Sequence, residues 1–282
     1  ADLATKEGVE EAWAFSQKNT VPLIVLGSGS NTIFADEEIN AFVVRISANA
    51  LQPVLSLSKG PTPYALEVES GKNLPMLINE LAQQGLDLSP LTGIPGTLGG
   101  AIFGNAGQGP KGIWIDHFVE SVTIYDGAWK TLTKADCKFT YRESIFKYGP
   151  AEFSILNSQF SISPIIWSAT LQIPPGEPSA IKSDIERLLI KRIETQPHQR
   201  TAGSCFKAVG GTPAWQLIDA VGLRGYKSGG VMVSEKHANF LIGEKGATFK
   251  DAVDVVSSVK AKIPEKLEVE MRFVKPDGSL LF

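Results

Sequence analysis

The chain has 282 residues, of which 43% are hydrophobic and 20% are charged, a composition typical of a soluble globular protein. This length exceeds the roughly 100 to 200 residues of one domain, so we expect two or three domains. The formal charge of -3 and the scattered Lys and Arg residues argue against a nucleic-acid partner, and no apolar run is long enough to suggest a membrane span.

Cysteine and histidine usage indicates neither a disulfide framework nor a metal site. Cys137 and Cys205 lie far apart without a Cys-x-x-Cys, and no two of the three histidines stand at metal-binding spacing. The first residues are polar and show no apolar stretch of a signal peptide. We therefore predict no metal and a cytoplasmic location.

A helix that leads into a buried strand is predicted at the start of the chain. Residues 8–19 carry apolar side chains at helical spacing, and the apolar run 21–26 is short enough for a strand. A glycine-rich loop, 27–31, follows directly, and a further strand is predicted at 41–46. The loop is therefore expected at the end of a strand.

A possible domain boundary and a second helix come next. Residues 47–63 show no hydrophobic period, which predicts an irregular connection, and 64–69 resumes the alternation of a strand. Asn73 is a predicted N-cap, Pro75 stands in the first turn, and Gly85 ends the helix. This helix leads to a second glycine-rich loop.

Three strands are predicted in the middle of the chain, at 118–124, 153–162 and 165–173. An amphipathic helix follows, which Pro197 ends. The apolar positions that mark this helix are Ile181, Ile185, Leu188, Leu189 and Ile193.

Two helices and a strand are predicted in the last part. One helix covers 213–221, and the other covers 249–260 with Thr248 and Asp251 as a capping pair. The final strand is predicted at 267–274.

The two glycine-rich loops have the composition of a phosphate-binding site. Residues 27–31 (Gly-Ser-Gly-Ser-Asn) offer closely spaced N–H groups with hydroxyl and amide side chains, and 93–101 adds a second glycine-rich backbone. The first loop lacks the third glycine and the later acid of a Rossmann fingerprint, so that site is not supported. Either loop alone could equally be a set of ordinary tight turns.

Five motifs in fixed order closely resemble the UDP-N-acetylenolpyruvoylglucosamine reductase family. They are Gly-Ser-Gly-Ser-Asn at 27–31, Gly-Ile-Pro-Gly-Thr-x-Gly-Gly at 93–100, Tyr-Arg-x-Ser-x-Phe-Lys at 141–147, Ala-Gly-Ser-x-Phe-Lys at 202–207, and Val-Ser-Glu-Lys-His-Ala-Asn-Phe at 233–240. The resemblance covers nearly the whole chain. The glycine loops also occur in the wider vanillyl-alcohol-oxidase-like FAD superfamily, from which the later motifs distinguish this family.

The resemblance implies an α+β fold, with a two-part FAD-binding module of the vanillyl-alcohol-oxidase type and a C-terminal α+β substrate-binding domain. The first FAD-binding subdomain is expected at 1–50, shortened because the family's usual opening does not precede the first helix. The second is expected at 51–199, and the substrate-binding domain at 200–266. Residues 267–282 are expected to return as a strand to the FAD module.

The resemblance also implies an oxidoreductase of peptidoglycan precursor synthesis. NADPH would reduce tightly held FAD, which would reduce UDP-N-acetylglucosamine enolpyruvate to UDP-N-acetylmuramate. We expect the FAD to be noncovalent, because neither glycine loop contains a His or Cys. The residues predicted to bind it are Gly27, Ser28, Gly29, Ser30, Asn31, Ile94, Pro95, Gly96, Thr97, Gly99, Gly100 and Asn105.

Three residues match the family's catalytic positions. Hydride addition to an enol ether leaves negative charge on the α-carbon and its carboxylate, and Arg142 matches the cation placed there. Ser204 matches the donor of the proton to the α-carbon. Glu270 matches a carboxylate near the reacting carbons, and Glu268 shares its strand face. Their ordinary alternatives are a surface ion pair, a turn residue and a solvated strand face.

Three further residues, Lys207, His237 and Asn239, are predicted to line the pocket for the UDP-sugar, with the lysine as a charge for phosphate or for NADPH. Ala208 and Val209 stand where the family usually has Asn-Pro, which predicts an altered contact to the UDP part. We expect a monomer that acts on small molecules.

Two other functions stay open. One is an FAD oxidase or dehydrogenase on the same scaffold with another substrate, against which the segment with Ser204 and Lys207 argues. The other is a non-catalytic flavin- or nucleotide-binding protein. The reaction of the reduced flavin with oxygen, and NADPH oxidation with and without the enolpyruvyl substrate, would distinguish the three.

Overall fold

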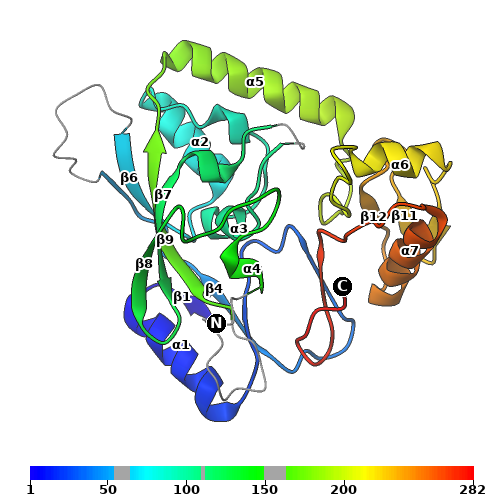
Figure 1. Ribbon diagram of the computed structural model, residues 1–282, viewed down its shortest axis with the longest axis horizontal. Helices are drawn as coiled ribbons and strands as arrows, with labels where there is room; N and C mark the ends of the chain where they lie inside the picture. Colours follow the sequence, from blue (N-terminus) through cyan, green and yellow to red (C-terminus); the bar gives the residue numbers. More distant parts are fainter. Residues whose placement is uncertain (54–63, 109–111, 149–162) are drawn as a thin grey trace. The chain divides into compact units, whose positions relative to one another are not determined.

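The computed structural model describes residues 1–53, 64–108, 112–148 and 163–282. The predicted strand at 153–162 lies outside these ranges. The chain forms two compact units (Figure 1). The first consists of Ala1–Ser28 and Ala41–Leu189, and the second of Gly29–Asn40 and Ile190–Phe282.

The first unit opens with a helix against a small parallel sheet, as predicted. Thr5 caps α1 (Lys6–Asn19) by accepting a hydrogen bond from the N–H of Gly8 at 3.1 Å. The apolar face of α1, which includes Val9 and Trp13, is buried against the sheet. The sheet has the order β1-β4-β2, with β1 at Asp2–Leu3, β2 at Leu23–Val25 and β4 at Phe42–Ile46.

A five-stranded antiparallel sheet forms the middle of the first unit. Its order is β5-β6-β9-β7-β8. The irregular connection predicted at 47–63 is wrong at Leu51–Pro53, which pairs with β6 as strand β5, and 54–63 lies outside the described residues. The other strands are β6 (Tyr64–Glu69), β7 (Val119–Tyr125), β8 (Trp129–Thr133) and β9 (Ile165–Ile173).

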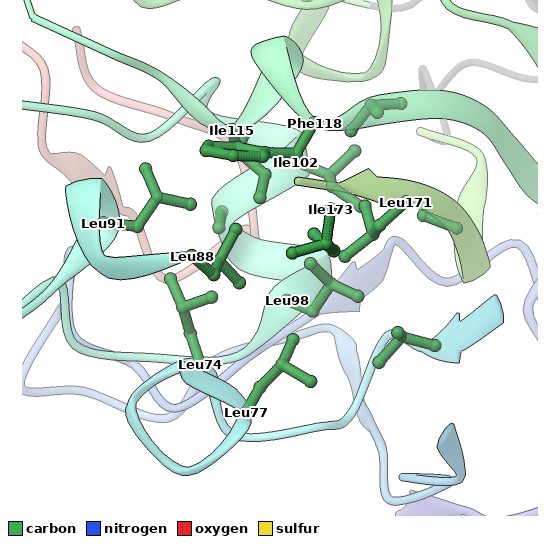
Figure 2. Close-up of a cluster of buried hydrophobic side chains, with 14 of the residues drawn as sticks. Leu74, Leu77, Leu88, Leu91, Leu98, Ile102, Ile115, Phe118, Leu171 and Ile173 are labelled. Atoms are coloured by element: carbon green, nitrogen blue, oxygen red, sulfur yellow. The ribbon is translucent and has the colours of Figure 1, made fainter. Parts of the chain in front are cut away.

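Helices α2 (Leu74–Gln83) and α3 (Leu98–Phe103) lie beside this sheet and share its core (Figure 1). Asn73 caps α2 as predicted, since its Oδ1 accepts the N–H of Met76 at 3.0 Å. Figure 2 shows leucine and isoleucine side chains from both helices and from β9 packed together. Short helical turns complete the unit: η1 (Ser89–Leu91), η2 (Ile115–His117) and α4 (Ile145–Tyr148).

Helix α5 (Pro178–Thr195) runs from the first unit into the second. The predicted amphipathic helix is present, but its apolar face is only partly covered. Ile181 and Ile185 are buried, whereas Leu189 and Ile193 are exposed. The hydrophobic period therefore located the helix correctly and overstated how much of it packs against other elements.

The second unit combines two helices with two small sheets. Helix α7 (Phe249–Lys262) begins with the predicted capping pair, because Thr248 and Asp251 each accept the other's backbone N–H. Helix α6 (Ala214–Ala220) begins after Pro213. The antiparallel sheet β10-β11-β12 has strands Lys227–Ser228, Val231–Val233 and Leu241–Gly243, and the parallel pair β13-β3 has strands Arg272–Val274 and Thr32–Phe34.

The predicted final strand is shorter than expected. Only Arg272–Val274 forms strand β13, whereas 267–271 makes isolated backbone bonds to the segment around Phe206. Apolar and charged residues alternate at 267–273, which is typical of one strand, but the backbone changes its partner at Arg272. The predicted α+β class is confirmed, and the proposed subdomain bounds stay a prediction.

Candidate active site

The two glycine-rich loops meet within the first unit. The first loop follows β2, and the second leads into α3, whose N-terminus Thr97 caps by accepting the N–H of Gly100 at 3.2 Å. A Cβ atom on Gly27 would lie 2.9 Å from Oγ1 of Thr97, so a larger residue would push the loops apart. The predicted phosphate-binding loops are therefore in contact at these two residues.

Backbone donors are available where the loops meet. Within the described ranges, the N–H groups of Gly27, Ser28, Gly96 and Thr97 have no hydrogen-bond acceptor. Gly96 has a φ of +111°, a backbone conformation that favours glycine. Adjacent N–H groups without an internal acceptor form the kind of concave site that binds phosphate oxygens.

Other predicted members of the second loop have structural roles. Gly99 donates its N–H to the carbonyl of Ser70 at 2.8 Å, and a Cβ atom on Gly99 would lie 2.8 Å from Cβ of Ser70. Ile94 is buried and donates its N–H to Leu91 at 3.2 Å, while Pro95 is exposed. Glycine at position 99 thus permits close packing of α3 on the end of β6.

The side chain of Asn105 is bonded within the protein. It is 1% exposed, its Nδ2 donates to the carbonyl of Thr140 at 2.8 Å, and its Oδ1 accepts the N–H of Asp116 at 3.3 Å. Both polar atoms of the side chain therefore connect protein loops. A contact of Asn105 with FAD stays a prediction, and the side chain's visible role is to hold the segment that precedes Arg142.

Arg142 lies in a tight turn with unusual backbone geometry. Its φ is +92°, which for a residue other than glycine costs on the order of 1–3 kcal/mol. Nη2 of Arg142 donates to the carbonyl of Gly107 at 2.7 Å, and Nζ of Lys147 donates to the carbonyl of Arg142 at 3.1 Å. Groups outside the turn therefore bond both to the half-buried guanidinium and to the backbone of Arg142.

Ser204 lies in a segment that has backbone partners on both sides. The N–H of Cys205 donates to the carbonyl of Asn239 at 2.8 Å, and the N–H of Glu270 donates to the carbonyl of Cys205 at 2.8 Å. Across the described residues, no group hydrogen-bonds to the Ser204 hydroxyl. The hydroxyl is thus available to a ligand while the backbone beneath it is fixed.

The second half of the first glycine loop lies beside this segment in the second unit. Nδ2 of Asn31 donates to the carbonyl of Glu270 at 3.2 Å, and the Asn31 carbonyl accepts the N–H of Arg272 at 3.0 Å. A Cβ atom on Gly203 would lie 3.8 Å from the carbonyl oxygen of Ser30. The structure therefore brings Asn31, Ser204 and Glu270 together, around the predicted reduction site.

Lys207 and Glu268 form an ion pair next to this segment. Nζ of Lys207 lies 3.1 Å from Oε2 of Glu268, and the Lys207 N–H donates to the Glu268 carbonyl at 2.9 Å. The lysine is 8% exposed, whereas the glutamate side chain is 61% exposed. Glu268, one of the two glutamates predicted on one strand face, thus pairs with Lys207.

The side chain of Asn239 bridges the backbone of Phe206. Its Oδ1 accepts the Phe206 N–H at 2.9 Å, and its Nδ2 donates to the Phe206 carbonyl at 2.8 Å. Asn239 is 7% exposed. The amide is therefore used to position the Ser204 segment, and a direct contact with the UDP-sugar stays a prediction.

His237 is half-buried between aromatic rings. Its ring lies 4.8 Å from that of Phe240 and 6.2 Å from that of Trp215, measured between centroids. Burial, and then the charge of Arg224, lower the pKa of His237 below its usual value. Its Nδ1 accepts the N–H of Asn239 at 3.3 Å, which leaves Nε2 to carry the proton of the neutral ring.

Both cysteines are buried thiols. Burial, with a smaller effect of Asp136, raises the pKa of Cys137 to about 12. Burial, and then the charge of Glu270, raise the pKa of Cys205 as well. Burial therefore disfavours the reactive thiolate form of both cysteines.

Known protein families match both units. Residues 2–132 match the model of an FAD binding domain, and residues 196–273 match that of the UDP-N-acetylenolpyruvoylglucosamine reductase C-terminal domain. A UDP-N-acetylenolpyruvoylglucosamine reductase of Streptococcus pneumoniae (strain CGSP14) is 35% identical over 268 residues, which cover 92% of this chain and 82% of that protein. The chain belongs to the UDP-N-acetylenolpyruvoylglucosamine reductase family.

Two further relatives support this membership. A UDP-N-acetylenolpyruvoylglucosamine reductase of Erythrobacter litoralis (strain HTCC2594) is 32% identical over 258 residues, with 90% of this chain and 73% of that protein covered. The crystal structure of the reductase from Thermus caldophilus superposes with a TM-score of 0.76 at 28% identity, and the match covers 96% of this chain and 90% of that one.

The residues present in the glycine loops fit a flavin dinucleotide. The backbone donors at Gly27, Ser28, Gly96 and Thr97 suit its pyrophosphate, and the close approach at Gly27 leaves no room for a side chain there. The matched FAD binding domain includes both loops. The first unit thus contains backbone donors that suit a dinucleotide phosphate, and their contact with FAD stays a prediction.

The structure assigns the predicted catalytic residues to different units, Arg142 to the first and Ser204 and Glu270 to the second. Sequence reasoning missed the roles of Lys147 and Asn31 in holding the backbone of these residues. For the role of Lys147, the sequence offered one indication, a lysine five positions after the arginine.

In the described ranges, no helix has the length and apolar character needed to cross a membrane, and no group of three His, Cys, Asp or Glu side chains could hold a metal ion.

Proposed function

We propose that this chain reduces UDP-N-acetylglucosamine enolpyruvate to UDP-N-acetylmuramate, with NADPH as hydride donor and noncovalent FAD as carrier. The observation that supports this most is the 202–207 segment, whose Ser204 hydroxyl is available on a fixed backbone. This segment lies within the match to the reductase C-terminal domain rather than within the FAD binding domain. An FAD oxidase with another substrate would not require it.

The chemistry requires a hydride at the β-carbon of the enol ether and a proton at its α-carbon. When bound, FAD supplies the hydride that it has accepted from NADPH. In the proposal, the Arg142 guanidinium pairs with the substrate carboxylate, where negative charge increases during the reaction. Its bond to the carbonyl of Gly107 supports this role, because a cation that is already oriented loses less entropy on binding.

Ser204 is proposed to give its hydroxyl proton to the α-carbon. General acid catalysis of this kind is typically worth about 10² to 10⁴ in rate. Glu270 is proposed to stand near the same carbon, supported by its N–H bond to Cys205, the residue after Ser204. In the proposal, its carboxyl group passes a proton from water to the serine oxygen, which restores the site for another turnover.

The second unit is proposed to bind the UDP-sugar through Lys207, His237 and Asn239. The buried ammonium of Lys207 supplies charge for a phosphate of the substrate or of NADPH. His237 is neutral near pH 7, because its pKa is lowered, and can donate from Nε2. We also propose that the protein acts as a monomer in the cytoplasm, and light scattering after gel filtration tests the first point.

The test is anaerobic reduction of the FAD-loaded protein by NADPH, followed by the enolpyruvyl substrate. We expect the yellow absorbance to disappear with NADPH, to return with substrate, and mass spectrometry to find a product heavier by two hydrogens. Reoxidation by oxygen but not by the substrate would favour an FAD oxidase or dehydrogenase. No reduction by NADPH would favour a non-catalytic flavin protein.

A further inference from the structure

The turn that carries Arg142 has a conformation that its sequence does not favour. Thr140 donates its N–H to the carbonyl of Glu143 at 3.1 Å, and Glu143 donates back at 3.3 Å, so Tyr141 and Arg142 are the two central residues. Arg142 has a φ of +92° at the second central position, where turns with positive φ usually have glycine or asparagine. Groups outside the turn must therefore hold Arg142 in this conformation.

Lys147 is such a group. Its Nζ donates to the carbonyl of Arg142 at 3.1 Å, and it lies 3.7 Å from Oε1 of Glu143. The lysine side chain is only 13% exposed. It projects from α4, which is itself anchored because Ile145 donates its N–H to Cys137 at 3.0 Å. The ammonium therefore binds the turn at the strained residue and at the next one.

Asn105 binds the same turn from another segment. Its Nδ2 donates to the carbonyl of Thr140 at 2.8 Å, an oxygen that also accepts the N–H groups of Arg142 and Glu143. The turn is thus bonded at its first residue by Asn105 and at its third by Lys147. Two fixed points on the backbone determine the direction in which the Arg142 side chain leaves it.

We propose that Lys147 is a positioning residue for Arg142 in the reduction of the enolpyruvyl substrate. It acts through the Arg142 carbonyl and maintains the backbone conformation from which the guanidinium meets the substrate carboxylate. The inference rests on the function proposed above for Arg142. A direct contact between Lys147 and substrate is the competing idea, and the test separates the two.

A double-mutant cycle on the two half-reactions is the first test. Lys147→Met should leave the reduction of FAD by NADPH unchanged and slow reoxidation by the enolpyruvyl substrate by about 10- to 100-fold, the effect expected of a displaced catalytic group. In an Arg142→Met background, Lys147→Met should slow reoxidation by less than about 2-fold further, because no guanidinium remains to be positioned. The proposal is wrong if the double variant is slowed by the product of the two single effects on reoxidation. It is also wrong if Lys147→Met alone is reoxidised at the normal rate.

Hydrogen exchange supplies a readout that does not depend on activity. Amides in the peptide 140–147 should exchange faster in Lys147→Met than in the wild-type protein, because the turn loses one fixed point. Unchanged exchange would contradict the proposal. If the wild-type flavin is not reoxidised by the substrate, the proposed function fails, while this measurement still decides whether Lys147 holds the turn.

Lys130→Met is the matched control. It removes a lysine that pairs with Asp126 at 2.7 Å in the same unit, and it should change neither half-reaction nor exchange at 140–147. Should Lys147→Met fail to bind FAD, Lys147→Gln, which keeps a hydrogen-bond donor, enters the same cycle. A non-additive result with Arg142→Met then supports the positioning role of Lys147, and an additive result contradicts it.

Discussion

The Arg142 turn and the Ser204 segment are held in place by different kinds of interaction. Backbone hydrogen bonds on both sides of Cys205 fix the segment with Ser204, in the manner of a short central strand. Side-chain bonds from Lys147 and Asn105 instead fix the turn with Arg142, whose own backbone is strained. One geometry follows from chain pairing, which most residues can provide, and the other depends on particular side chains.

This difference predicts how each region responds to substitution. Around Ser204, the geometry of the backbone should withstand most substitutions and should change when the amide of Asn239 that bonds to Phe206 is removed. Around Arg142, the substitution of one side chain outside the turn, such as Lys147, should alter the conformation of the turn. The predictions below test the Ser204 region, as the cycle at Lys147 tests the Arg142 turn.

Removal of the Ser204 hydroxyl should have the largest effect. Ser204→Ala should slow reoxidation of the flavin by the enolpyruvyl substrate by about 10²- to 10⁴-fold, because the proton for the α-carbon is lost. Reduction by NADPH needs no such proton and should stay normal, which stopped-flow absorbance measures separately. Ser258→Ala changes a serine on α7 that is bonded to the hydroxyl of Tyr226, and it should affect neither half-reaction. Equal slowing of both halves would instead indicate a role in folding or flavin binding.

Asn239→Ala should have the next largest effect, on stability. It leaves the N–H and the carbonyl of buried Phe206 without partners, and we expect a loss of about 3 kcal/mol in the free energy of unfolding, measured by urea denaturation. Asn239→Asp is the matched variant. It should also destabilise, because a carboxylate oxygen would face the Phe206 carbonyl. A loss below about 0.5 kcal/mol for both would show that backbone pairing alone fixes this segment.

Lys207→Ala should have a smaller effect, on affinity. Loss of a buried ammonium that binds phosphate should raise the Michaelis constant for the enolpyruvyl substrate or for NADPH by about 10-fold, with less change in kcat. Glu268→Gln removes the partner carboxylate, 3.1 Å away, and should not raise either constant. If neither constant changes in Lys207→Ala, the assignment of this residue is wrong.

The pH dependence of stability should show the smallest effect. His237 has a lowered pKa in the folded state, so the unfolded chain binds more protons as the pH falls toward the usual pKa of about 6.5 and below. Stability should therefore decrease from pH 7.5 to 5.5. His237→Gln should reduce this decrease, as followed by urea denaturation at both values. An identical decrease in the variant would show that other groups cause it.

The sequence alone predicted most elements, because their signals are local. The caps at Asn73 and at Thr248 with Asp251 are satisfied within one helical turn, and the structure confirms them. Hydrophobic period located α5, yet it could not show that Leu189 and Ile193 remain exposed. The strand predicted at 267–274 was too long for a related reason, since alternation does not reveal where a strand changes its partner.

The sequence by itself also determined the family, through motifs whose order no local rule explains, and it named the side chains proposed for chemistry. Only the tertiary structure decided how those side chains are held. The positive φ of Arg142 and the bonds from Lys147 and Asn105 depend on segments that meet only after folding. The same is true of the bonds between the Asn239 amide and the backbone of Phe206. Hydrogen bonds between residues far apart in the chain leave no period or spacing in the sequence, so only the folded chain reveals them.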